Sequence, residues 1–135
     1  MEQSEKSEKI LNLEKNYKEL KKIKKEYSYN DIKDDLKKQW ALRYGFFESI
    51  QIIIDLSCHI TVKKNLGNPG KYSDCIELLG KNNYISKELK DKLLKMIGLR
   101  NILVHEYIEI DLDKLYNLLD NIDDFKQFVE EIISE

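Results

Sequence analysis

The chain contains a single proline, Pro69, and this scarcity limits what it can fold into. The segment 65–70, NLGNPG, also holds two of the five glycines and is the clearest loop. Proline and glycine interrupt regular structure, so a 135-residue chain with so few of them should consist mainly of long, unbroken elements. Apolar residues recur at spacings of three and four rather than two, which predicts helices. We therefore expect an all-α bundle of four or five helices.

The apolar pattern predicts where these helices lie. We expect them at about 5–26, 34–64, 73–82, from 86 past 100, and about 112–133. Asn30 or Asp31 could cap the second helix. Ser86 could begin the fourth, although Glu88 follows it by two positions rather than three, so the capping box is imperfect. Trp40, in the second of these helices, is expected to pack in the core of the bundle.

Length and composition predict one soluble domain spanning 1–135. The charged N-terminus lacks the apolar segment of a signal peptide. The most apolar run, FFESIQIIIDLSCHITV, contains Glu48, Asp55 and His59, so it predicts a buried helix and no membrane span. Cys58 and Cys75 have no zinc-type spacing, and we expect reduced thiols in a cytoplasmic protein.

Charge is unevenly distributed along the chain. The net charge is −2, which excludes a globally basic nucleic-acid binder but not a local basic patch. After residue 105 only Lys114 and Lys126 are basic among many carboxylates. A polyanion such as RNA should therefore approach elsewhere. The expected path lies near Lys87, Lys90, Lys92, Lys95 and Arg100.

Arg100 occupies an apolar position of the fourth helix, between Met96 and Leu103. A guanidinium there costs free energy unless it is paired or lines a polar cleft. Asn101 and His105 are four residues apart and share a helical face. One interpretation is structural: Arg100 reaches a carboxylate at the edge of the bundle, and His105 caps the end of the helix.

The other interpretation is a site for a phosphodiester. Arginine would hold the phosphate and stabilise negative charge in the transition state, and histidine would move protons near neutral pH. Attack by a ribose 2′-hydroxyl needs no metal and no cofactor. Arg100 and His105 are five residues apart and diverge on one helix, so the spacing favours a homodimer whose two copies share one cleft.

The stretch RNILVHEY (100–107) resembles the Arg-Asn-x-x-x-His signature of the HEPN superfamily, in the fuller Arg-x-x-x-x-His-x-Tyr form of HepT-like toxins. The resemblance extends over roughly 8–132, through RYGFFESIQIIIDLSCHI, GNPGKYSDCIELLGKNNYIS and LRNILVHEYIEIDLDKLY. It implies a single HEPN domain that forms a dimeric helical bundle.

The resemblance also implies roles for individual residues. HepT-like proteins are metal-independent ribonucleases, so Arg100 and His105 would be catalytic and Asn101 would orient them. In these toxin–antitoxin systems an MntA-type minimal nucleotidyltransferase neutralises the toxin by transferring AMP to the motif tyrosine, here Tyr107. An anionic adduct two residues from His105 would oppose an incoming RNA phosphate.

Two further functions remain open at this stage. The chain could be a non-catalytic HEPN binding partner of a minimal nucleotidyltransferase, or a purely structural dimer that leaves the motif unexplained. Other polar residues have simpler interpretations: His59 is expected to be a hydrogen-bonded core or interface histidine, with Asp55 as its possible partner. Arg43 or Glu48 could supply a polar group to the wall of the cleft.

Overall fold

The computed structural model describes residues 1–104 and 111–135; within this part, the side chains of Asn101 and Val104 are not described. The described residues form helices and no strands. The elements are α1 (Gln3–Glu26), α2 (Tyr29–Lys33), α3 (Leu36–Lys63), α4 (Tyr72–Lys81), α5 (Lys87–Val104), α6 (Leu112–Asn117), the 3-10 turn η1 (Leu118–Asn121) and α7 (Asp123–Ile132). The predicted all-α class is confirmed.

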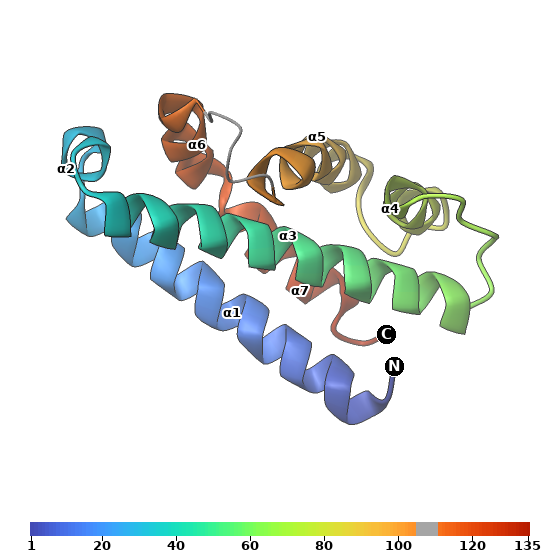
Figure 1. The fold of residues 1–135 in the computed structure, drawn as a ribbon. Coiled ribbons are helices and arrows are strands. Elements are labelled where there is room, and N and C mark those ends of the chain that lie inside the picture. Colours follow the sequence, from blue (N-terminus) through green and yellow to red (C-terminus); the bar gives the residue numbers. More distant parts are fainter. Residues whose placement is uncertain (105–110) are drawn as a thin grey trace.

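Helix α3 is the centre of the fold. Figure 1 shows it running along the molecule, with α1 on one side and α4 and α5 on the other. Helix α7 packs against α1, α3 and α5, so the last helix closes the bundle. The core contains Phe46, Ile50, Ile54 and Ile60 of α3 together with Phe125 of α7, all almost completely buried.

The first three predicted helices correspond closely to α1, α3 and α4, but a short helix, α2, was not predicted. Ser28 and Asp31 cap it reciprocally: the Asp31 backbone N–H donates to Ser28 Oγ (3.2 Å), and the Ser28 N–H donates to the Asp31 carboxylate (2.9 Å). The expectation that Asn30 or Asp31 caps the second long helix was wrong. Asp35 does so, accepting from the backbone N–H of Lys38 (3.1 Å).

The predicted helix 112–133 is divided into α6, η1 and α7. In a 3-10 turn, residues three apart lie on the same side, and Leu119 and Ile122 are accordingly both buried. The tighter turn thus keeps apolar side chains inward on both sides of the break. Apolar periodicity predicted the buried face but could not detect this local change of winding.

Helix α5 begins after Ser86, as predicted, but its cap is completed by another helix. Ser86 Oγ accepts from the Leu89 backbone N–H (3.2 Å). The carboxylate missing from the local sequence comes from Glu131 of α7, which accepts from the Ser86 N–H (2.6 Å). This contact fixes the start of α5 against the end of the chain.

Two other expectations were wrong. Cys58 and Cys75, expected as reduced thiols, form a disulfide between α3 and α4. The packing of α4 against α3 brings the two Cα atoms to 5.0 Å, a distance that 17 residues of sequence separation did not reveal. Trp40, expected in the core, is 59% exposed.

By length and composition alone α3 could cross a membrane. More than half of its most apolar window is buried inside the bundle, however, against α1, α4 and α5. It is the central helix of the core, which confirms the prediction of a buried helix for this run.

Candidate active site

Arg100 leaves the core although its neighbours on the apolar stripe, Met96 and Leu103, are buried. Its Nε donates to Gln51 Oε1 of α3 at 2.6 Å. Its guanidinium carbon lies 5.3 Å from the centroid of the Tyr72 ring, at the start of α4. Three helices therefore hold the arginine at the surface. The Gln51 and Tyr72 contacts thus fix the direction of the guanidinium, a group whose planar set of N–H donors suits a phosphate.

Gln51 is oriented by its own partner. Its Nε2 donates to Asp55 Oδ1 (2.9 Å), one turn further along α3. Asp55 Oδ2 in turn pairs with Lys9 Nζ of α1 at 3.2 Å. Since a carboxylate can only accept and a guanidinium can only donate, the amide must present its oxygen to Arg100. We call Lys9, Asp55, Gln51 and Arg100 the α3 relay.

The α3 relay replaces the suggested pair of Asp55 with His59. Asp55 is engaged by Gln51 and Lys9 instead. His59 is half-buried, and burial lowers its pKa, helped by the positive charges of the N-terminal amino group, Lys6 and Lys63. His59 forms no hydrogen bond with the described residues, so the hydrogen-bonded role expected for it stays a prediction.

Glu48, proposed as a polar wall residue, is also engaged. It accepts from the Tyr44 hydroxyl and from Asn16 Nδ2 (2.9 Å). The hydrogen bond to Glu48 raises the pKa of Tyr44. Arg43 differs, because its Nη2 is buried and has no hydrogen-bond partner among the described residues.

The α3 relay borders an exposed apolar face. Trp40, Tyr44 and Val62 of α3 are separated from Gln51 by seven to eleven residues, so all of them point to a similar side of the helix. These three side chains are 59%, 62% and 72% exposed, and Tyr72 beside Arg100 is 54% exposed. We call Trp40, Tyr44, Val62 and Tyr72 the outer face. Exposed side chains of this size are often covered by another molecule.

Of the predicted site residues, Arg100 lies within the described part of the chain with its side chain. Asn101 belongs to α5, but its side chain is not described. His105 and Tyr107 lie outside the described residues. Their association with Arg100 therefore stays a prediction. Gln51 was not predicted, although a polar residue between Ile50 and Ile52 in the most apolar run was a usable signal.

The lysines expected along an RNA path do not form one patch with Arg100. Lys90 pairs with Glu77 of α4 (3.8 Å) and with its neighbour in α5, Asp91 (3.4 Å). Lys92 pairs with Asp124 of α7 (3.6 Å), and Lys95 lies near it on the flank facing α6. Helical geometry thus divides a run that looked continuous in sequence.

Comparison with known proteins identifies the fold. The tri-AMPylated HEPN toxin of Shewanella oneidensis, solved in complex with MNT antitoxin, matches with a TM-score of 0.88 at 32% identity over 100% of both chains. A toxin–antitoxin structure with AMP-PNP matches with a TM-score of 0.88 at 31% identity, over 96% of this chain and 98% of the other. The fold and the arginine site thus define an HEPN-type helical protein.

The sequence comparisons are more specific. Residues 13–132 match the sequence model of the family described as Ribonuclease HepT-like. The mRNA nuclease HepT of Shewanella oneidensis is 35% identical over 118 residues, 86% of this chain and 89% of that protein. The chain belongs to the Ribonuclease HepT-like family. This confirms the predicted family and the predicted class of function, a ribonuclease of the toxin–antitoxin type.

Proposed function

We propose that this chain is a toxin that cleaves RNA without a metal, at a site formed by Arg100 and His105 in a homodimer. The observation that carries the proposal is the position of Arg100, held at the surface by Gln51 and Tyr72 instead of being buried with its stripe. A relative of similar length is named as an mRNA nuclease, which points to RNA as the substrate.

The proposed chemistry uses each group for what it can do. Arg100 binds the scissile phosphate and stabilises the charge that develops as the ribose 2′-hydroxyl attacks. His105 takes the proton from that hydroxyl, or returns one to the departing 5′-oxygen. The products are a 2′,3′-cyclic phosphate and a free 5′-hydroxyl. Asn101, next to Arg100, would orient the pair.

A homodimer would supply the second set of groups that acid–base catalysis requires. Tyr72 supports this part of the proposal, because its ring is exposed and lies 5.3 Å from the Arg100 guanidinium. In a twofold dimer the same patch meets itself, so two copies of Arg100 and His105 would approach one cleft. The proposed unit is one HEPN domain over 1–135, acting in the cytoplasm.

The proposed partner is an MntA-type nucleotidyltransferase antitoxin that adds AMP to Tyr107. Support comes from a relative described as a tri-AMPylated toxin in complex with MNT antitoxin. AMP transfer would convert a neutral phenol into an anionic group two residues from His105, which would repel the RNA phosphate. Incubation with ATP and the cognate antitoxin should therefore add multiples of AMP, and equal labelling of Tyr107→Phe would exclude this tyrosine.

The nuclease proposal is tested by purified protein and RNA in EDTA. We expect cleavage with 2′,3′-cyclic phosphate ends, and loss of cleavage in His105→Ala and Arg100→Ala. Undiminished cleavage by His105→Ala would rule out the assigned site. The alternative, a non-catalytic partner of a nucleotidyltransferase, predicts a tight complex but no RNA cleavage and no toxicity of the chain expressed alone.

A further inference from the structure

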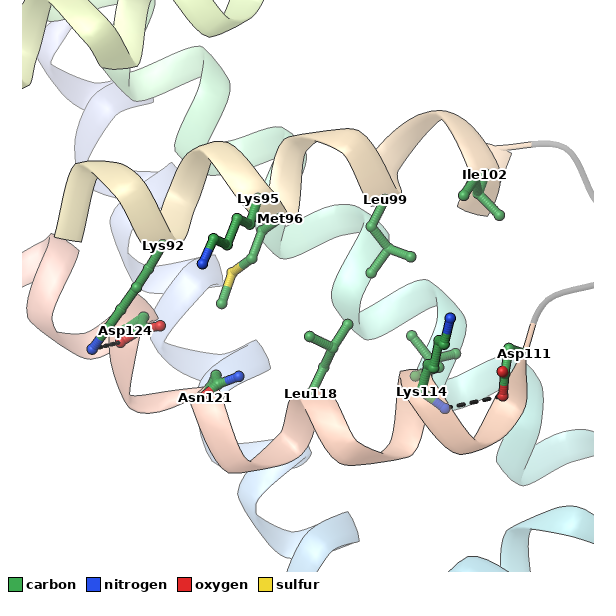
Figure 2. Close-up of a pocket in the computed structure, with 11 residues that line it drawn as sticks. Lys92, Lys95, Met96, Leu99, Ile102, Asp111, Lys114, Leu118, Asn121 and Asp124 are labelled. Carbon is green, nitrogen blue, oxygen red and sulfur yellow. Dashed lines mark hydrogen bonds and ion pairs between the residues drawn. The ribbon is translucent and has the colours of Figure 1, made fainter. Parts of the chain in front are cut away.

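A second concave site lies along α5, and no residue of the α3 relay lines it. It is a cavity of about 630 Å³ between α5 and the segment formed by α6, η1 and the start of α7 (Figure 2). We call it the α5–α6 cavity. Its volume falls within the range of about 300–1,000 Å³ that small-molecule sites occupy. Some side chains that line the cavity also pack in the core of the bundle, but the cavity itself has no role in the proposed cleavage.

The floor of the α5–α6 cavity is apolar. Met96 and Leu99 come from α5, and Leu115 and Leu118 come from α6 and η1. Met96 and Leu115 are buried, while Leu99 and Leu118 are half-buried and border the open space. Figure 2 shows Leu99 and Leu118 pointing toward each other across the gap. A flat apolar ring could lie between these side chains.

The rim of the cavity carries two lysines and also the carboxylate of Asp111, whose Oδ1 accepts from the Lys114 backbone N–H (3.2 Å). Lys95 on α5 and Lys114 on α6 are exposed and line opposite sides of the opening. Within the described residues, neither ammonium group forms an ion pair, whereas nearby Lys92 pairs with Asp124 at 3.6 Å. Two uncommitted ammonium groups above an apolar floor match a ligand with a flat body and an anionic group.

Asp124 closes one end of the cavity but offers little to a ligand. The residue is 7% exposed, its Oδ1 pairs with Lys92, and its Oδ2 is buried with no hydrogen-bond partner among the described residues. Burial raises the pKa of its carboxyl, opposed by the charge of Lys92. The apolar floor and the two lysines of the rim are therefore the features that a ligand would meet.

We infer that the α5–α6 cavity binds a nucleoside monophosphate group, with the base between Leu99 and Leu118 and the phosphate between Lys95 and Lys114. The choice of a nucleotide among flat anions rests on the proposed function, which brings both RNA and AMP to this chain. The group could thus be a nucleotide of the RNA or the adenylyl group on Tyr107. Tyr107 stands four residues before Asp111 in the sequence, and four residues of chain span at most about 14 Å.

The test is calorimetric titration of the full-length unmodified protein with AMP. AMP should bind, and adenosine should bind more weakly because it lacks the phosphate. Lys95→Ala and Lys114→Ala should each weaken AMP binding about tenfold, the loss expected for one charge-assisted contact. Leu99→Phe, which narrows the cavity without altering charge, should weaken it as well. Lys25→Ala, an exposed lysine of α1, removes the same charge far from the cavity and should bind AMP like the parent protein.

The two sources of the nucleotide are separated by competition. If the site serves RNA, an uncleavable 2′-O-methyl oligonucleotide should displace AMP from the parent protein. If it serves the adenylyl group, protein modified by antitoxin and ATP should no longer bind free AMP. The inference is overturned if AMP does not bind, or if the Lys95, Lys114 and Leu99 variants bind AMP as tightly as the parent protein. So does the finding that these variants lose only antitoxin binding, which would make the cavity a protein contact.

This measurement is independent of RNA cleavage. A protein that binds AMP in the cavity but cuts no RNA would contradict the proposed function and retain the site. A nuclease whose AMP binding is unaffected by the cavity variants would contradict the site alone.

Discussion

Gln51 should control the activity of this protein although it is not expected to touch RNA. The proposed change is Gln51→Leu, which keeps a side chain of similar size and removes the acceptor for Arg100 Nε (2.6 Å) and the donor to Asp55 (2.9 Å). Arg100 would keep its position on α5 but lose the contact that fixes its side-chain direction. The result should be a slower enzyme with an unchanged fold.

The size of the effect follows from the contact that is lost. A hydrogen bond to a charged group contributes about 1.5–3 kcal/mol, and the lower end applies because Arg100 is only partly buried. About 1.5 kcal/mol corresponds to a roughly tenfold loss in kcat/KM. Misplacement of the guanidinium by about 1 Å could extend the loss toward a hundredfold. Since the change concerns positioning of the transition state, kcat should fall more than KM rises.

The assay is cleavage of a fluorogenic oligoribonucleotide in EDTA, with thermal unfolding measured in parallel. Gln39→Leu is a matched control on α3, because Gln39 donates only to the backbone carbonyls of Ile32 and Lys33. That variant should lose stability and retain kcat per folded molecule. If Gln51→Leu kept kcat/KM within twofold of the parent, the α3 relay would have no part in catalysis.

Three further predictions follow from other parts of the fold. Trp40→Glu should shift the chain from dimer to monomer in sedimentation and reduce RNA cleavage in parallel; a stable dimer would place the dimer contact elsewhere. Tyr17 donates to Asp123 (2.5 Å) and thereby lowers the pKa of that carboxyl below its ordinary value of 3.8. Tyr17→Phe should therefore destabilise the fold at neutral pH, by less than the ~1 kcal/mol of a typical hydrogen bond because Asp123 is exposed to solvent. A lowered carboxyl pKa stabilises the fold above pH 3.8, and this stabilisation is lost as the pH falls through the lowered value. The difference in free energy of unfolding between Tyr17→Phe and the parent should therefore disappear in acid. A difference that stayed constant with pH in urea unfolding would contradict this explanation. Gly98→Ala should stabilise α5 by about 0.5–1 kcal/mol because an added Cβ meets no atom within 4 Å, whereas Gly45→Ala should not, since a leucine of α1 lies 2.9 Å from its added Cβ; equal melting temperatures for the two variants would be unexpected.

Much of the fold could be predicted because it depends on patterns within single segments. The apolar spacing of 5–26, 34–64 and 73–82 determines which face of each helix is buried, and those helices formed close to their predicted ends. The contacts that could not be predicted join distant segments. Glu131 completes the cap of Ser86 across 45 residues, and Lys9 reaches Asp55 across 46. No local pattern encodes such pairs, because they depend on how the helices pack.

Arg100 and Trp40 show why the sequence predicted one surface side chain correctly and the other wrongly. Arg100 was recognised as unusual because a charge on an apolar stripe is conspicuous, whereas Trp40 was assigned to the core because an apolar residue on a stripe is not. Trp40 is exposed and Arg100 is partly exposed. The proposed homodimer would account for both, because a cleft shared by two copies needs an apolar contact surface as well as the charged groups that act in it.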